Sequence, residues 1–168
     1  MIFRRRVAQL TEAALARFVS TARRVAGVRG AVDVLVTSKR EMRLLNSRFL
    51  GKDRPTDVLA FPSEPCSVKI NAGEIAISAE IASENARRLG HNIAEEIKIL
   101  ALHGILHLAG YDHEQDKGEM ARKELRLRST LNLPSGLMER ISWAGTAGKR
   151  RDRSGRKPSR APKARRLR

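Results

Sequence analysis

Residues 93 to 113, "IAEEIKILALHGILHLAGYDH", combine a long apolar helix pattern with a glycine turn. Apolar side chains surround this segment almost completely between Ile93 and Ala109. A helix that is apolar all round is normally buried, so we predict that this helix lies at the centre of the fold. Gly110 stands where the helix should end, because glycine takes up positive φ values without a steric penalty.

Short strands and amphipathic helices are predicted around this central segment. In residues 11–25, apolar side chains recur every three or four positions, as on the buried face of a helix. The valine-rich segment "AVDVLVTS" is bounded by turn residues, which is typical of a strand. Strands are predicted over residues 31–38, 57–61 and 73–78, and helices over residues 11–25, 39–49, 79–89, 93–109 and 114–131. This irregular mixture predicts an α+β fold, a small mixed β-sheet packed with about five helices.

The positive charge of the chain is concentrated at its C-terminal end. The 168 residues carry a formal net charge of +16. Eleven of the 34 Lys and Arg residues but one of the 18 Asp and Glu residues lie in residues 145–168, which leaves 23 basic and 17 acidic residues for positions 1–144. The last segment has no apolar periodicity and cannot offset its ordering entropy. We therefore predict one domain over residues 1–144 and a disordered basic tail over residues 145–168.

The charge also indicates which partners to expect. Phosphate backbones are strongly attracted to a basic protein, so we predict RNA or DNA rather than acidic lipid as the partner. The alternative is that the charges serve solubility alone. Aromatic residues make up only 4% of the chain, which argues against base stacking on many rings.

Cysteine content and hydropathy predict a cytoplasmic location. Cys66 is the single cysteine of the sequence, which excludes an internal disulfide and fits a reducing compartment. No apolar run approaches the roughly 20 residues that a membrane-spanning helix needs. We therefore predict a cytoplasmic protein that does not insert into membranes.

Three of the four histidines lie within the eleven residues "HGILHLAGYDH". His103 and His107 are four residues apart, so both imidazoles project from one helix face. A turn at Gly110 allows His113 to fold back towards them. Three neutral imidazoles are typical of a zinc site whose fourth position is open to water, which is the catalytic rather than the structural arrangement. The alternative is that each histidine serves locally, as we expect for His91 in its turn.

The same spacing, H-x-x-x-H-x-x-G-x-x-H, occurs in the metzincin zinc peptidases. We therefore predict a metalloprotease-like zinc helix in the core. In those peptidases a glutamate follows the first histidine and acts as general base. Gly104 occupies that position here and has no side chain to accept a proton. A zinc metallopeptidase is therefore the weaker prediction for an enzyme.

Three motifs together resemble a known family. The stretch "ALHGILHLAGYDHEQD" resembles the H-G-x-L-H-L-x-G-Y-D-H signature of the YbeY endoribonucleases, or rRNA maturation factors, and "GKDRPTDVLAFP" and "GEIAIS" resemble its two other motifs in the same order. The motifs span residues 46–116, and the general pattern extends over about residues 1–143. The resemblance implies one zinc ion per chain, held by His103, His107 and His113. It also implies a metal-dependent endoribonuclease that cuts single-stranded RNA in 16S rRNA 3′-end maturation and ribosome quality control, with the small ribosomal subunit as partner.

The loop motif departs from this family at one position. Many relatives have an arginine that assists cleavage just before the glycine of "GKD", where this chain has Leu50. Arg48, Lys52 and Arg54 are the candidates for phosphate contacts, because guanidinium and ammonium groups match phosphate oxygens. Their alternative role is that of ordinary loop charges. Leu50 and the basic tail also leave open a non-catalytic ribosome- or RNA-binding factor with structural zinc.

Five polar residues near these motifs receive more limited predictions. Asp112 is a candidate to accept the second N–H of a zinc-bound imidazole. Glu114 and Asp116 are expected to cap the following helix. Asp57 is expected to be a loop or strand-edge partner rather than a general base. Asn46 is expected either to anchor the "GKD" loop or to contact RNA.

Overall fold

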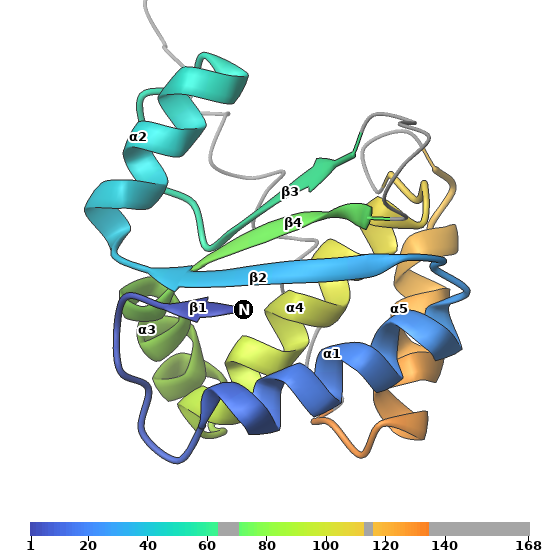
Figure 1. Ribbon diagram of the computed structural model, residues 1–168. Coiled ribbons are helices and arrows are strands. Elements are labelled where there is room, and N and C mark those ends of the chain that lie inside the picture. Colours follow the sequence, from blue (N-terminus) through green and yellow to red (C-terminus); the bar gives the residue numbers. More distant parts are fainter. Residues whose placement is uncertain (64–70, 113–115, 135–168) are drawn as a thin grey trace, which may run out of the picture. The chain divides into compact units, whose positions relative to one another are not determined.

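The sheet of the computed structural model has four strands, and the structure describes residues 1–63, 71–112 and 116–134. The strands are ordered β1 (Ile2–Phe3), β2 (Ala31–Thr37), β4 (Asn71–Ser78) and β3 (Val58–Pro62) across the sheet. Strand β2 runs parallel to β1 and β4, whereas β3 runs antiparallel to β4 at one edge (Figure 1). The sheet is therefore mixed, as the sequence predicts.

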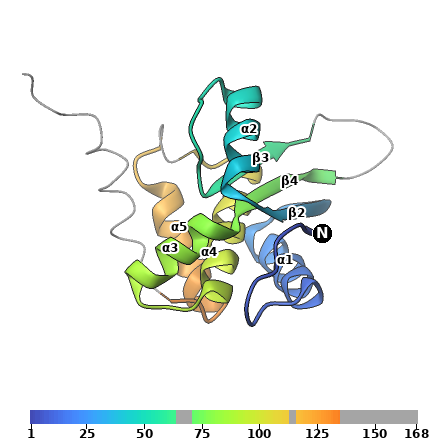
Figure 2. The same cartoon turned by 90° about the vertical axis from the view of Figure 1, so that its left-hand side faces the viewer.

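Helices cover both faces of this sheet. The described residues form α1 (Glu12–Ala26), α2 (Lys39–Leu50), α3 (Ala79–Leu89), α4 (Ile93–Leu108) and α5 (Glu119–Thr130). Helices α1, α3, α4 and α5 lie on one face, and α2 lies alone on the other (Figures 1 and 2). The predicted α+β class with about five helices is confirmed.

Helix α4 forms the centre of the main core, as its sequence predicts. Its side chains Ile97, Leu100, Leu102, Ile105 and Leu106 are all completely buried. They pack with residues of α1, α5, β2 and β4 in one hydrophobic cluster. A helix enclosed in this way is a rigid base for any side chain that it presents.

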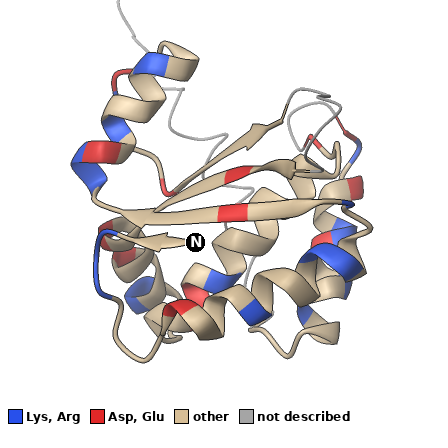
Figure 3. Cartoon of the chain, viewed as in Figure 1, with Lys and Arg blue, Asp and Glu red and all other residues tan. Residues whose placement is uncertain are grey.

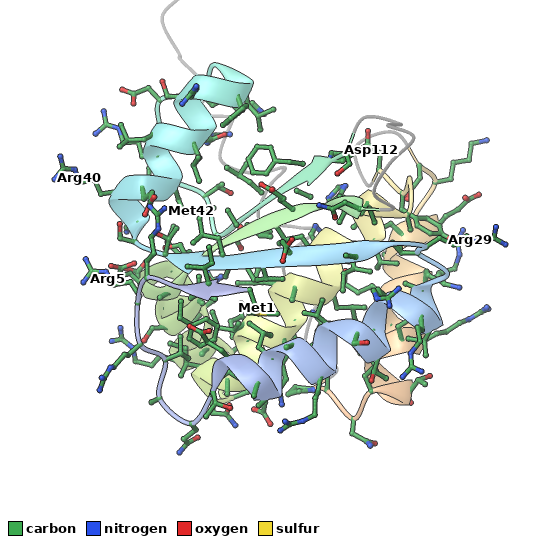
Figure 4. The ribbon with its side chains drawn as sticks, in the orientation of Figure 1. Met1, Arg5, Arg29, Arg40, Met42 and Asp112 are labelled. Carbon is green, nitrogen blue, oxygen red and sulfur yellow. The ribbon has the colours of Figure 1, made fainter. Side chains whose placement is uncertain are left out.

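A second, smaller core lies under α2. It consists of Met42 from the helix with Leu59 and Ala76 from the sheet, and Leu45 and Phe61 pack against it. Figure 4 shows Met42 directed from α2 towards the sheet, while Arg40 points away from it. Helix α2 is therefore fixed to the sheet along one side only.

The helix boundaries follow from local capping. The side chains of Thr11, Ser38, Ser78 and Asn92 each accept a hydrogen bond from the backbone N–H three residues later. These bonds satisfy N–H groups that have no partner within the helix. Helix α3 ends at Gly90 with φ +75°, as predicted.

Several boundaries differ from the sequence prediction, and three of these differences have a clear physical reason. Sequence patterns do not predict strand β1. This strand has only two residues, and it is defined by the pairing of Ile2 with Leu35 of β2, which no local pattern shows. Strand β3 includes Pro62, which is tolerated because β3 is an edge strand. Helix α5 begins at Glu119, not at residue 114, because Gly118 with φ +81° precedes it.

The predicted C-terminal features lie outside the described residues. They are the boundary near residue 144, the apolar segment up to Trp143 and the disordered tail over residues 145–168. Among the residues that are described, no helix is long and apolar enough to cross a membrane.

Candidate metal centre

His103 and His107 face each other on α4, as their spacing predicts. The two Nε2 atoms are 3.2 Å apart, and the ring planes meet at 76°. Zinc–nitrogen bonds of about 2.0 to 2.1 Å in a tetrahedral site hold two ligand nitrogens about 3.3 Å apart. The distance between the two nitrogens therefore fits two ligands of one zinc ion.

The turn after α4 begins as predicted. Gly110 has φ +88°, its N–H donates to the carbonyl of His107 at 3.0 Å, and Tyr111 N–H donates to the carbonyl of Leu106 at 3.1 Å. These two bonds close the helix and reverse the chain. Asp112 follows, half-buried (Figure 4). The predicted third ligand, His113, lies outside the described residues, and within them no three His, Cys, Asp or Glu side chains are placed to share a metal ion.

A buried carboxylate holds the other nitrogen of His103. Glu124 of α5 is 4% exposed, and its Oε2 lies 3.0 Å from His103 Nδ1. A carboxylate accepts hydrogen bonds, so Nδ1 is the donor in this contact, and in the neutral imidazole that a metal requires the lone pair is then on Nε2. This Nε2 atom is the one that faces His107. Zinc-bound histidines usually have such a partner, which fixes the tautomer and the ring orientation.

Arg128 in turn holds Glu124. Its Nε and Nη2 donate to Glu124 Oε1 at 3.1 and 2.9 Å, and its Nη1 donates to the carbonyl of Pro134 at 3.1 Å. The side chain is 2% exposed. Burial lowers the pKa of Arg128 and the Glu124 carboxylate opposes that shift, but an arginine stays protonated. The series Arg128–Glu124–His103 therefore connects a buried cation to a candidate metal ligand.

Gly104 lies where α4 crosses β4. A Cβ atom at this position would come within 2.9 Å of both Cδ1 and Cγ2 of Ile75. A glutamate, as in the zinc peptidases, would require either the Ile75 side chain or the helix to shift. Close packing against Ile75 is thus a physical reason for a glycine at position 104, where the zinc peptidases have the glutamate that acts as general base.

Comparison with known proteins identifies the family. Residues 2–132 match the family model described as Endoribonuclease YbeY. The chain belongs to the YbeY endoribonuclease family. It is 53% identical over 154 residues to Endoribonuclease YbeY of Koribacter versatilis, covering 91% of this chain and 99% of that protein. It is also 45% identical over 139 residues to Endoribonuclease YbeY of Solibacter usitatus, covering 83% and 92%.

A solved structure supports the fold. The solution structure of TM1509 from Thermotoga maritima superposes with a TM-score of 0.51 at 29% sequence identity. The match covers 92% of this chain and 100% of that one. The resemblance of the three motifs to the YbeY family is confirmed.

Three exposed cations lie at the end of α2 and in the family's loop motif that follows it. Arg48 lies in the last turn of α2, and Lys52 and Arg54 lie in the loop between α2 and β3. None of the three forms a salt bridge within the described part of the chain. Leu50, where the resemblance leads us to expect an arginine, is 55% exposed. The structure thus brings the phosphate-contact candidates together on one exposed segment.

Asn46 anchors this loop. Its side chain is 3% exposed, and its Nδ2 donates to the carbonyl of Arg54 at 2.7 Å. Of the two roles considered for Asn46, the geometry favours the anchor over contact with RNA.

Asp57 is a partner of the loop and strand, as predicted. Its carboxylate accepts hydrogen bonds from Val58 N at 3.0 Å, Thr56 Oγ1 at 3.3 Å and Asn85 Nδ2 at 3.4 Å. These contacts fix the start of β3.

Asp116 caps α5, as predicted. Its carboxylate accepts from the backbone N–H of Met120 at 2.8 Å, Gly118 at 2.7 Å and Glu119 at 3.2 Å. These hydrogen bonds, the one from Met120 most of all, lower the pKa of Asp116. Glu114, the other predicted cap, lies outside the described residues.

His91 does more than occupy a turn. Its backbone N–H donates to the carbonyl of Ala86 at 3.1 Å, as a residue after Gly90 should. Its Nε2 also lies 2.7 Å from Glu96 Oε2, and both side chains are buried. The fourth histidine therefore stabilises the start of α4 and is separate from the candidate metal pair.

Glu124 and Arg128 are the site residues that sequence reasoning missed. The signal for Glu124 is present in the sequence, because it occupies the apolar stripe of α5 between Met120 and Leu127. A carboxylate in such a stripe requires a buried partner. Arg128, four residues later, is in position to provide one.

Proposed function

We propose that this chain is a zinc-dependent, single-strand-specific endoribonuclease that acts in 16S rRNA 3′-end maturation and ribosome quality control. The observation that carries the proposal is the pair of facing Nε2 atoms of His103 and His107, with His103 held from behind by Glu124. Membership of the YbeY family supports the reaction class. A metallopeptidase is not proposed, because Gly104 has no proton-relaying side chain and is closely packed.

His103, His107 and His113 would hold the ion. Zinc, when bound, supplies a Lewis acid for a phosphoryl oxygen and lowers the pKa of a coordinated water to about 7. Glu124 keeps the proton of His103 on Nδ1 and so directs the Nε2 lone pair towards the site. Asp112 remains the candidate to hold the imidazole of His113 in the same way.

Arg48, Lys52 and Arg54 would bind the RNA backbone. Their side chains are exposed, and two of them project from a loop whose backbone Asn46 fixes. Cations on a fixed backbone lose little entropy when they bind phosphates. Contacts of this kind position RNA without selecting a sequence.

The remaining proposals concern place and partners. We propose that the protein acts in the cytoplasm on an rRNA precursor bound to the small ribosomal subunit. The basic tail, residues 145–168, would act as an RNA- or ribosome-binding arm, which its eleven Lys and Arg residues support. Deleting it is expected to weaken RNA binding and its salt dependence. Unchanged binding across a salt titration would contradict this role.

Cleavage by the purified full-length chain tests the reaction. The substrates are a single-stranded RNA and the same sequence in a duplex, and the controls are a chelator, chelator followed by zinc, and His107→Ala. We expect cleavage of the single strand that both the chelator and His107→Ala abolish and that zinc restores after chelation. Cleavage indifferent to chelator and substitution would reject a metal mechanism.

Complementation tests the biological role and the non-catalytic alternative. In cells that lack the gene, we expect 16S rRNA precursors with extended 3′ ends, which the wild-type gene removes and a His107→Ala gene does not. Full rescue by the zinc-free but folded variant would favour a binding factor over an enzyme.

A further inference from the structure

Among the Phe and Tyr residues that the structure describes, Phe49 alone is exposed. It keeps 55% of its surface accessible, whereas Phe3, Phe18, Phe61 and Tyr111 are half-buried. An exposed phenyl ring forgoes the stabilisation that burial would give it. Exposed aromatic rings in basic surroundings are typical of proteins that stack single-stranded nucleic acid.

The ring of Phe49 is held in place rather than free. The centroid of the Phe61 ring lies 5.0 Å away at an interplanar angle of 63°, an edge-to-face contact. Phe61 packs in turn against the small core that Met42, Leu59 and Ala76 form under α2. The guanidinium of Arg48 lies 5.5 Å from the Phe49 ring centroid. A ring restrained in this way loses little entropy when it stacks.

The cations that follow Phe49 are also on a fixed backbone. Arg43 binds Asp53 through two hydrogen bonds, Nε to Oδ1 at 2.7 Å and Nη2 to Oδ2 at 2.6 Å. This pair neutralises the one acidic side chain of residues 51–54 and ties the loop to α2. Lys52 and Arg54 form no salt bridge in the described residues, and Figure 3 shows basic residues along α2 as well.

Charge and ring together select the occupant. An apolar partner helix would need an apolar surface, but Arg48 lies 5.5 Å from the ring centroid, and Lys52 and Arg54 follow in the next loop. None of these three cations forms a salt bridge in the described part of the chain. A single RNA strand offers both complements, phosphates for the cations and an unstacked base for the ring. A duplex offers only the phosphates, because its bases are already stacked.

We propose that Phe49, backed by Phe61, is a stacking platform for one unpaired base of the RNA, with Arg48, Lys52 and Arg54 on the adjacent phosphates. The inference rests on the proposed function, in that it takes RNA as the substrate. It adds a physical origin for single-strand preference. Strand β3 follows this loop and packs on α4, so the platform belongs to the same unit as the histidine pair.

Binding of full-length variants to oligoribonucleotides tests this platform. Phe49→Leu keeps apolar contact with Phe61 but has no π face, Phe49→Trp enlarges the face, and Phe49→Ala removes both. Leu44→Ala is the matched control, because Leu44 is 61% exposed on the same helix. The probes are a labelled single strand, the same strand with one abasic position moved along it, and the duplex.

The expected result separates stacking from simple packing. Phe49→Leu and Phe49→Ala should raise Kd for the single strand about 5-fold or more, while Phe49→Trp and Leu44→Ala bind as wild type. Affinity for the duplex should stay unchanged in all variants. One abasic position should weaken binding of the wild type but not of Phe49→Leu, which shows that the ring and that base act as a pair.

Two results would overturn the inference. If wild type and Phe49→Leu bind the single strand with equal Kd values and both cleave it, the stacking role of Phe49 is rejected but the proposed function is not. The exposed ring would then be assigned to contact with a protein partner. No RNA binding or cleavage by the wild type would sink the proposed function and the platform with it. Thermal unfolding of each variant shows whether a weaker binder is still folded.

Discussion

The histidine pair and the loop after α2 differ in how their residues are held. His103 is supported by Glu124 and Arg128, which are 4% and 1% exposed. Arg48, Lys52 and Arg54 are exposed and lie on a segment that is anchored through its backbone. The comparison teaches that substitutions of Glu124 or Arg128 should lower the stability and the metal affinity of the protein. Substitutions in the loop should weaken only the binding of RNA.

The sharpest contrast is between two arginine–carboxylate pairs. Arg128→Met leaves Glu124 buried without its cation and is expected to lower the free energy of unfolding by about 3 to 5 kcal/mol. Arg43→Met breaks the exposed pair with Asp53, and its free energy of unfolding is expected to equal that of the wild type within error. Urea denaturation of both variants measures the difference. Equal losses would contradict the distinction between the two regions.

Glu124→Gln is expected to have the next largest effect. The amide keeps the shape of the side chain but removes the charge that orients His103, so zinc affinity should fall about 10- to 100-fold. Competition with a chromogenic chelator measures this affinity. Glu119→Gln, at the exposed start of the same helix, is the matched control and should bind zinc as the wild type does. If Glu124→Gln bound zinc equally well, Glu124 would serve the fold alone.

Lys52→Gln together with Arg54→Gln tests the loop. The double variant should weaken binding to single-stranded RNA and reduce the slope of log Kd against log salt by about one for each phosphate that the loop no longer neutralises. Its melting temperature should match that of the wild type. A salt titration with an unchanged slope would assign these cations to solubility.

Asp116→Asn is expected to have the smallest effect, and it depends on pH. The pKa of Asp116 is lowered in the folded protein, so its carboxylate stabilises the fold above its unfolded pKa of about 3.9. That stability is lost as the pH falls through the folded value. The wild type should therefore melt above the variant at pH 7, and the gap should close in acid. A gap that is constant with pH would rule out a contribution from the charge.

Periodicity and turn chemistry predict most of this fold, because each acts locally. Local sequence is enough to predict the apolar run of α4, the glycine turn at position 110 and the helix cap at Ser78. Strand β1 is not, since two residues carry no periodicity. The His103 and His107 pair follows from helix geometry, but its contact with Glu124 joins residues 21 positions apart on two helices. Only the packing of α5 against α4 brings that carboxylate to the ring.

Zinc content after equilibrium dialysis tests the central claim most directly. The full-length wild type is compared with His107→Ala and with His91→Gln, which changes the histidine that pairs with Glu96 outside the candidate site. The account predicts one tightly held zinc ion per chain in the wild type and in His91→Gln, and none in His107→Ala. Equal zinc in wild type and His107→Ala, or no zinc in any of the three, would contradict it.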